Sequence, residues 1–318
     1  MRWLGALAVG LLLALPPFLG SYAVTLLTLI FFYAYLGQAW NVLGGYAGQL
    51  SVGHAAFVGI GAYVTAVLFL RWGITPWLGM FVGAAAAAGL GAVIGYLGFR
   101  FGLRGFYFVL LTVAFAEVCR IVALNTEAIG GAVGLYITFT GDPRQFQFQD
   151  PRAYYYVALA LMLAATGAVW RLERSRLGAY LTAIKEDEQA ALALGVDAFR
   201  CKLIASVASA FATGLGGAFY AFFYFSLQPN SLFGIPLSVE IILRPIVGGA
   251  GTLLGPVVGS FILSPLAEVS RTYFAALGFA GVHLIVYGAL LIAVVLFLPH
   301  GACPSLVRLW VRQRAAPR

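Results

Sequence analysis

The chain has 318 residues, of which 62% are hydrophobic and 9% are charged, and its mean hydropathy is +0.95. A soluble domain carries about 25% charged residues, so this composition excludes a soluble protein and predicts an all-α, polytopic membrane protein. The net charge of +8 does not indicate nucleic-acid binding, because the basic residues lie in short loops and a tail, as in membrane proteins that obey the positive-inside rule.

About ten apolar runs are long enough to cross the bilayer fully or halfway. They lie near residues 4–20, 22–42, 53–70, 77–98, 103–124, 153–171, 203–226, 237–248, 252–267 and 281–298. The first run is similar to a secretory signal, but further spans follow it, so we interpret it as an uncleaved span. The short runs 237–248 and 252–267 are joined by VGGAGTLLGP, which fits either two half-helices or a re-entrant hairpin.

Charge predicts the orientation of these spans. Ten spans with both termini in the cytoplasm place 13 of the 19 Lys and Arg residues on the cytoplasmic side. Residues 125–152 then form an external loop, and residues 171–202 form the long charged loop of the cytoplasmic side. We expect residues 1–318 to form a single transmembrane domain.

Motifs for nucleotide binding and catalysis are missing from the chain. There is no G-x-x-x-x-G-K-[ST] sequence, and the only lysines are Lys185 and Lys202, which excludes a P-loop within this chain. Neither H-E-x-x-H nor G-x-S-x-G occurs, and the three cysteines are far apart. We therefore predict no catalytic residue, no metal site and no cofactor in this chain.

The cytoplasmic loop contains a run of strong helix formers from Thr182 to Leu194, followed by Gly195. Gly is a common residue just past a helix C-terminus, so the pattern predicts one short amphipathic helix. Such a helix suits a groove on a soluble partner. A solvated helix that only links two spans fits the composition as well.

Four motifs resemble those of one transporter family. They are NVLGGYAGQLSVGHAAFVGIGAY from Asn41, GFYFVLLTVAFAEVCRIV followed by GGAVGL, SRLGAYLTAIKEDEQAALALGVDAFRCKL from Ser175, and VGGAGTLLGPVVGSFIL from Val247. In this order they resemble the LivM-type permease subunit of branched-chain amino acid ABC importers, over roughly residues 30–300. Within the third, AALALG resembles the EAA loop of importer permeases, although Gln189 replaces the usual glutamate and I-x-L-P is absent.

This resemblance implies an ABC-importer permease bundle that works with other subunits. Those are a second permease, expected to be a different chain, two cytoplasmic ATPases that bind the ATP, and an extracytoplasmic solute-binding protein. The membrane would be the plasma membrane of a bacterium or archaeon. The loop helix would couple ATP hydrolysis to transport: Gly195 ends it, the alanines allow close approach, and the glutamates meet the partner's polar rim. The implied coupling residues are Ala183, Glu186, Glu188, Ala190, Ala191 and Gly195.

The substrate and the energy source have alternatives. Relatives that carry urea or short amides share the motifs, so they compete with branched-chain amino acids as substrates. An ion-coupled secondary transporter is favoured by broken, glycine-rich spans and buried charges. The coupling-type loop argues against an ion-driven carrier.

Polar residues within the spans are the candidates for the translocation path. Glu117 with Arg120 and Glu240 with Arg244 have helical spacing, and a charge at the bilayer centre costs about 2.5–3.5 kcal/mol on insertion scales. Each pair either lines the path or is a structural tie, between helices or across the interface with the partner. We interpret His54 as a helix-packing residue rather than a proton relay.

The glycine-rich stretch that begins at Asn41 is predicted to break a span near the cytoplasmic face. Asn41, Gln49 and Ser51 are expected to bond backbone groups freed by the break. Its glycines also suit close helix packing. Our hypothesis is that this stretch forms part of an inner gate.

Overall fold

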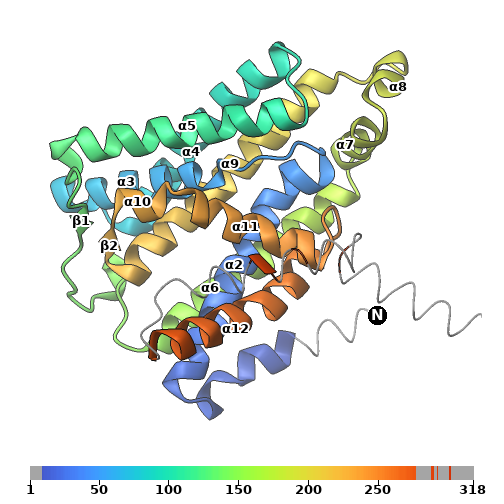
Figure 1. The fold of residues 1–318 in the computed structure, drawn as a ribbon. Helices are drawn as coiled ribbons and strands as arrows, with labels where there is room; N and C mark the ends of the chain where they lie inside the picture. The colour runs from blue at the N-terminus through green and yellow to red at the C-terminus, as the bar shows by residue number, and fades with distance from the viewer. Residues whose placement is uncertain (1–8, 277–287, 290–291, 293–300, 302–318) are drawn as a thin grey trace, which may run out of the picture.

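The structure is a computed structural model that describes residues 9–276, 288–289, 292 and 301. Long helices run side by side between two ends of the molecule (Figure 1). In chain order the elements are η1 (Pro16–Phe18), α2 (Ser21–Asn41), η2 (Val42–Tyr46), α3 (His54–Trp72), α4 (Pro76–Arg100), α5 (Phe106–Asn125), η3 (Glu127–Ile129), β1 (Leu135–Tyr136), η4 (Pro143–Gln145), α6 (Pro151–Glu173), α7 (Arg176–Glu186), α8 (Glu188–Ala193), α9 (Ala198–Tyr224), β2 (Ser226–Leu227), α10 (Pro229–Leu232), α11 (Ile235–Gly248) and α12 (Gly255–Ala276).

Local sequence signals explain where several of these helices begin and end. Proline is the first residue of α4 and of α6, where its missing N–H costs nothing. Asp150 caps α6, because its carboxylate accepts the Arg152 backbone N–H at 2.9 Å. At the far end of α3, Gly73 adopts a left-handed conformation, with φ of +62°.

Within the described residues, seven helices are long and apolar enough to cross a membrane. They are Ser21–Tyr46, His54–Trp72, Pro76–Arg100, Phe106–Asn125, Pro151–Glu173, Ala198–Tyr224 and Pro229–Gly248. The predicted span 4–20 is described only in part, and 281–298 lies outside the described residues. The predicted length of 252–267 was wrong, because α12 has 22 residues and is about 33 Å long, not a half-helix.

Glycines set the distance between the central helices. A Cβ added to Gly61 of α3 would lie 2.0 Å from the carbonyl oxygen of Gly214 in α9. A Cβ on Gly217 would lie 2.1 Å from the Val58 carbonyl oxygen, so the same two helices touch again one turn away. No larger residue fits at these contacts, which confirms the predicted packing role of glycine in this part of the chain.

The two ends of the bundle differ in structure. At one end, β1 and β2 form a short antiparallel pair, with Leu135 opposite Leu227. The predicted external loop 125–152 therefore adds a small sheet to an otherwise helical fold. At the other end lie α7, α8 and the α11–α12 turn, residues 249–254 (Figure 1). We refer to these as the β1–β2 end and the α7–α8 end.

Candidate functional site

The charged loop folds as two short helices rather than one. Asp187 interrupts the run with an extended backbone, at φ −152° and ψ 106°. Its carboxylate accepts the backbone N–H groups of Gln189 and Ala190 at 2.9 and 3.0 Å and so caps α8. The predicted continuous helix from Thr182 to Leu194 was therefore wrong, because Asp187 ends α7 and starts α8.

Glu188 attaches α8 to the membrane-spanning bundle. Its Oε1 accepts a hydrogen bond from Lys202 Nζ at 2.6 Å, and its Oε2 lies 3.2 Å from Arg104 Nε. The Lys202 ammonium is buried and lies 5.2 Å from the centre of the Phe99 ring. One carboxylate thus links the loop to α9 and to the connection between α4 and α5.

The predicted coupling residues divide into an exposed and a buried group. Ala183, Glu186 and Ala190 are exposed. Glu188 is held by Lys202 and Arg104, and Ala191 is buried. Glu188 and Ala191 therefore hold α8 against the bundle, and their contact with a partner subunit stays a prediction.

Gly195 follows α8 at the position predicted for a helix stop. Its φ is +85°, and its backbone N–H donates to the Leu192 carbonyl at 2.9 Å. The next N–H, from Val196, donates to the Ala191 carbonyl at 3.1 Å. The left-handed conformation needed here explains the glycine.

Asn41 at the end of α2 clamps the α11–α12 turn. Its Nδ2 donates to the Thr252 carbonyl at 3.0 Å, and its Oδ1 accepts the Gly251 N–H at 2.8 Å. One turn earlier, Gln38 Nε2 donates to the Leu253 carbonyl at 2.7 Å. The helix continues through the π-helical turn η2 to Tyr46, and residues 47–53 form no helix, so the predicted break in the glycine-rich stretch is confirmed.

Lys185 of α7 lies against both glycine-containing turns. A Cβ added to Gly48 would lie 2.9 Å from Lys185 Cγ, and a Cβ on Gly251 would lie 3.0 Å from Lys185 Nζ. The two turns also touch each other, since that second Cβ would lie 2.8 Å from the Gly45 carbonyl oxygen. Gln49, which we expected to bond freed backbone, donates to the Ala47 carbonyl at 3.2 Å.

Ser51 and His54 belong to a buried hydrogen-bond chain behind these turns. Ser209 donates its hydroxyl proton to the Ala39 carbonyl at 2.7 Å, so towards His54 Nε2, at 2.9 Å, it acts as the acceptor. His54 Nε2 therefore carries the ring proton, and Nδ1 accepts from the Ser51 hydroxyl at 2.9 Å. With a neutral His54 imidazole, every donor and acceptor of this hydrogen-bond network has a partner, in agreement with a packing role.

The first ion pair lies on an exposed flank of α5. Arg120 Nε donates to Glu117 Oε2 at 2.9 Å, and a second guanidinium N–H reaches the other carboxylate oxygen. Arg120 also donates to Asn230 Oδ1 of α10 at 2.7 Å. The side chains of Arg120 and Glu117 are 26% and 47% exposed, so the surrounding helices leave this pair open.

The second ion pair is a buried tie between helices. Arg244 is 1% exposed, and its guanidinium lies 3.6 Å from the centre of the Tyr33 ring in α2. It also bonds the Glu240 carbonyl and reaches Ser264 of α12 at 3.4 Å, while the Glu240 carboxylate is 3.9 Å away. Among the described residues no contact joins this pair to the pair on α5.

Comparisons with known proteins identify the family. A family model described as "Branched-chain amino acid transport system / permease component" matches residues 22–295. The chain belongs to this family. It is 29% identical to the high-affinity branched-chain amino acid transport system permease protein LivM of Escherichia coli (strain K12), over 92% of this chain and 73% of that protein. It is also 24% identical to the permease protein LivH of Salmonella typhimurium (strain LT2), over 85% of this chain and 90% of that protein. No solved structure matches it.

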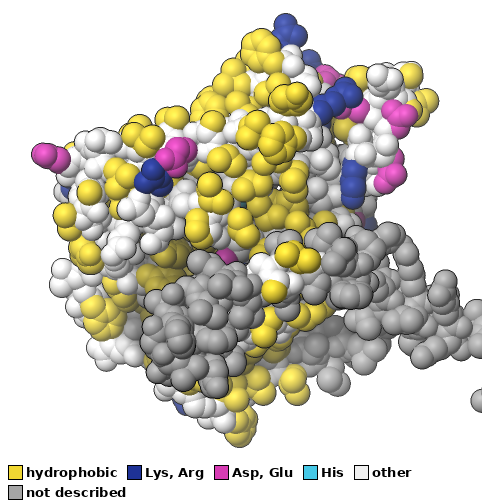
Figure 2. Space-filling view, in the orientation of Figure 1, with side chains coloured by type: hydrophobic (Ala, Val, Ile, Leu, Met, Phe, Trp, Pro, Cys, Tyr) yellow, Lys and Arg dark blue, Asp and Glu magenta, His cyan; other side chains and the backbone are white. Residues whose placement is uncertain are grey.

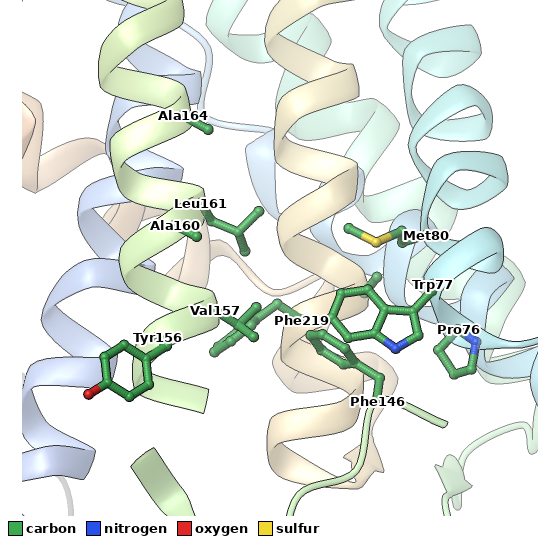
Figure 3. A pocket seen from close by; sticks show the side chains of 11 residues that line it. Pro76, Trp77, Met80, Phe146, Tyr156, Val157, Ala160, Leu161, Ala164 and Phe219 are labelled. Carbon is green, nitrogen blue, oxygen red and sulfur yellow. The ribbon is translucent and has the colours of Figure 1, made fainter. Parts of the chain in front are cut away.

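This branched-chain amino acid permease is a multi-pass membrane protein, and two grooves on the described part of its surface are apolar. One groove of about 450 Å³ lies among α4, α6, α9 and the loop at the β1–β2 end, with Trp77 and Met80 facing Val157 and Leu161 (Figure 3). A second, of about 470 Å³, lies between α3 and α5. No charged side chain lines either groove, so neither offers a site for the charged ends of an amino acid.

Sequence reasoning missed three residues of this permease that connect elements. The sequence alone assigned no role to Gln38, Lys185 or Lys202. The rarity of lysine was the available signal, because the two lysines of the whole chain both lie at the α7–α8 end. Each of the three residues contacts another element of the fold, and a local sequence pattern does not predict such tertiary contacts.

Proposed function

We propose that this permease is the membrane subunit of an ATP-driven importer and forms the translocation path for branched-chain amino acids. A solute-binding protein outside the membrane delivers the substrate, and two cytoplasmic ATPase subunits bind and hydrolyse the ATP. A second permease chain completes the path. Similarity to both LivM and LivH, two differently named permease proteins, supports a partner that is a different chain.

The α7–α8 end is cytoplasmic in this proposal, in the plasma membrane of a bacterium or archaeon. The bias of Lys and Arg towards this end supports the orientation, with both termini inside. The ATPases then contact exposed residues of α7 and α8, among them Ala183, Glu186 and Ala190.

The contact of Lys185 with two glycine-containing turns is the observation on which the coupling mechanism rests. Lys185 touches the α2–α3 connection at Gly48 and the α11–α12 turn at Gly251. Asn41 holds the second turn through two hydrogen bonds. In the proposed mechanism these turns close the inner end of the path, and α7 lies against the closure.

Movement of the ATPases would open this closure. Because Glu188 is bonded to Lys202 and Arg104, displacement of α8 is passed to α9 and to the α4–α5 connection as a rigid-body shift. Lys185 then leaves the two turns, and the Asn41 hydrogen bonds break.

The predicted path residues take two roles. Asn41 and Gln49 lie at the inner closure, and Glu117 with Arg120 lines the path. Ser51, His54, Glu240 and Arg244 are buried or bonded within the chain, so we assign them to holding the helices around the path in position.

A reversible crosslink tests this mechanism. A Cβ on Gly48 would lie 3.4 Å from the Cβ of Lys185, near the range of about 3.5–4.5 Å found in disulfides. We expect Gly48→Cys with Lys185→Cys, in a background with the native cysteines replaced by Ala, to form a disulfide under oxidation. Leucine uptake by proteoliposomes of the full complex should fall at least about 10-fold in the crosslinked state and return on reduction.

The single-cysteine variants serve as controls, because oxidant should leave their uptake unaffected. A non-hydrolysable ATP analogue should slow crosslinking, since α7 would leave the turn. Uptake that persists in the fully crosslinked complex contradicts the proposed inner gate.

A competition experiment tests the substrate class. Isoleucine and valine, but not urea, should compete with leucine for uptake, and competition by urea contradicts the proposed substrate class.

A further inference from the structure

The Glu117–Arg120 pair occupies an unusual place for charged side chains. The two are the only charged residues of the span Phe106–Asn125, which has the highest mean hydropathy of the seven spans, 2.0. That span is also the least enclosed of the seven: 22% of its most apolar stretch is buried, against 67% for Ser21–Tyr46. Figure 2 shows mainly hydrophobic side chains over α5. The pair therefore lies in the bilayer segment that the chain itself covers least.

Charged groups at this depth need water or protein beside them. Ionisable residues in membrane spans almost always face the bundle interior or a water-filled cavity. Position 117 is just past the middle of the 20-residue helix α5, too far from either end for the short Glu117 side chain to reach the interface. The flank of α5 that bears the pair is therefore expected to face water or a neighbouring protein chain rather than lipid.

The bonding of the pair leaves groups free for a ligand. A guanidinium has five N–H groups, and Arg120 uses three of them, two on the Glu117 carboxylate and one on Asn230 Oδ1. Each Glu117 oxygen retains acceptor capacity, and the Asn230 amide is exposed. The remaining groups are guanidinium and amide N–H donors beside a carboxylate acceptor.

We propose that Glu117, Arg120 and Asn230 form a binding station for the zwitterionic head group of an amino acid on the translocation path. The ligand's carboxylate binds the free N–H groups of Arg120 and the Asn230 amide, and its ammonium group binds Glu117. Planar guanidinium–carboxylate pairing gives such a station directional recognition. The station binds the ammonium and carboxylate groups, which all α-amino acids share. This inference rests on the proposed transport function.

Variants without the charges distinguish this binding station from an ion pair that only stabilises the helix packing. We expect Glu117→Gln, Arg120→Gln and the double variant each to lower leucine uptake by the reconstituted complex at least about 10-fold. If the pair were only a structural tie, each single variant would leave one unpaired charge, and the double variant would recover uptake. Val122→Ala, an exposed change on the same helix, is the control and should transport normally.

Co-purification of the variants with their partner subunits keeps a folding defect distinguishable from a transport defect. A second measurement changes the substrate: alanine has the same ammonium and carboxylate groups as leucine but lacks its large side chain. Uptake of alanine, delivered by a solute-binding protein that accepts it, should fall by the same factor in Arg120→Gln. The station is overturned by near-normal uptake in either single variant or by recovery in the double variant. Loss of ATP-dependent uptake in the unaltered complex would instead contradict the proposed function.

Discussion

Lys202 Nζ donates a hydrogen bond of 2.6 Å to Glu188 Oε1, and this contact joins the loop that bears α7 and α8 to the start of α9. The Lys202 side chain is 5% exposed and that of Glu188 is 16% exposed. The ammonium group is therefore largely removed from water, and its other close neighbour is the Phe99 ring. A partly desolvated charge of this kind depends on its counter-ion.

Glu188→Gln is expected to destabilise the protein by about 1–3 kcal/mol, because it leaves the Lys202 ammonium without an ionic partner. Thermal unfolding of the detergent-solubilised complex measures the effect. Glu186→Gln is the matched control, since Glu186 is exposed on the neighbouring helix, and it should change stability by less than about 0.5 kcal/mol. Equal unfolding temperatures for both variants would contradict the assigned role of Glu188.

Gly195→Val is expected to strain the backbone, because a non-glycine residue at φ +85° costs about 1–3 kcal/mol. A Cβ at this position meets nothing within 4 Å, so the strain arises from the backbone conformation alone. We expect less leucine uptake per ATP hydrolysed, as the strained turn displaces α8. Gly195→Asn is the control, since Asn tolerates the left-handed region, and it should retain most of the coupling. A Val variant that couples as well as the Asn variant would remove Gly195 from the mechanism.

Local sequence signals predicted the spans well and the loop helix poorly, for physical reasons. Hydropathy and length alone locate a span, and the predicted run 77–98 differs by at most two residues at either end from α4. In the loop, every residue from Lys185 to Glu188 is compatible with a helix, but Asp also caps helix N-termini well. In the structure Asp187 caps α8, and the next residue, Glu188, bonds Lys202, which lies 14 positions away in the sequence.

A local sequence pattern also could not predict how deeply each of the two ion pairs within the spans is buried. Both pairs have helical spacing, yet Arg120 faces Asn230 at a partly exposed surface, while Arg244 is enclosed beside Tyr33. The difference comes from which helix flank each arginine occupies after packing. In the sequence the two pairs look alike. Only the tertiary structure shows that Glu117–Arg120 is partly exposed and that Arg244 is buried.

His54→Ala is expected to cost about 2–4 kcal/mol, because it removes a buried ring and leaves the Ser51 hydroxyl without its acceptor. His54→Asn can keep the bond to Ser51 and His54→Gln the bond to Ser209, so each should cost less than Ala. Unfolding temperatures of the three variants provide the comparison. Because the neutral ring only holds helices together, uptake by the Gln variant should keep the same pH profile between about pH 6 and 8. A displaced profile would point to proton transfer through His54.

The contact between Arg244 and Tyr33 is expected to stabilise the packing of α2 on α11 through a cation–π interaction. A guanidinium 3.6 Å from a ring centre gains about 2 kcal/mol when desolvated, and Arg244 is 1% exposed. A double-mutant cycle with Tyr33→Leu and Arg244→Met isolates this energy, because Met retains much of the arginine's apolar stem. We expect a coupling energy of about 1–2 kcal/mol from unfolding measurements. Tyr33→Phe keeps the aromatic face, so a cycle built on it should show little coupling. A coupling below about 0.5 kcal/mol in the Leu cycle would mean that Arg244 is held by its bonds to the Glu240 carbonyl and Ser264 instead.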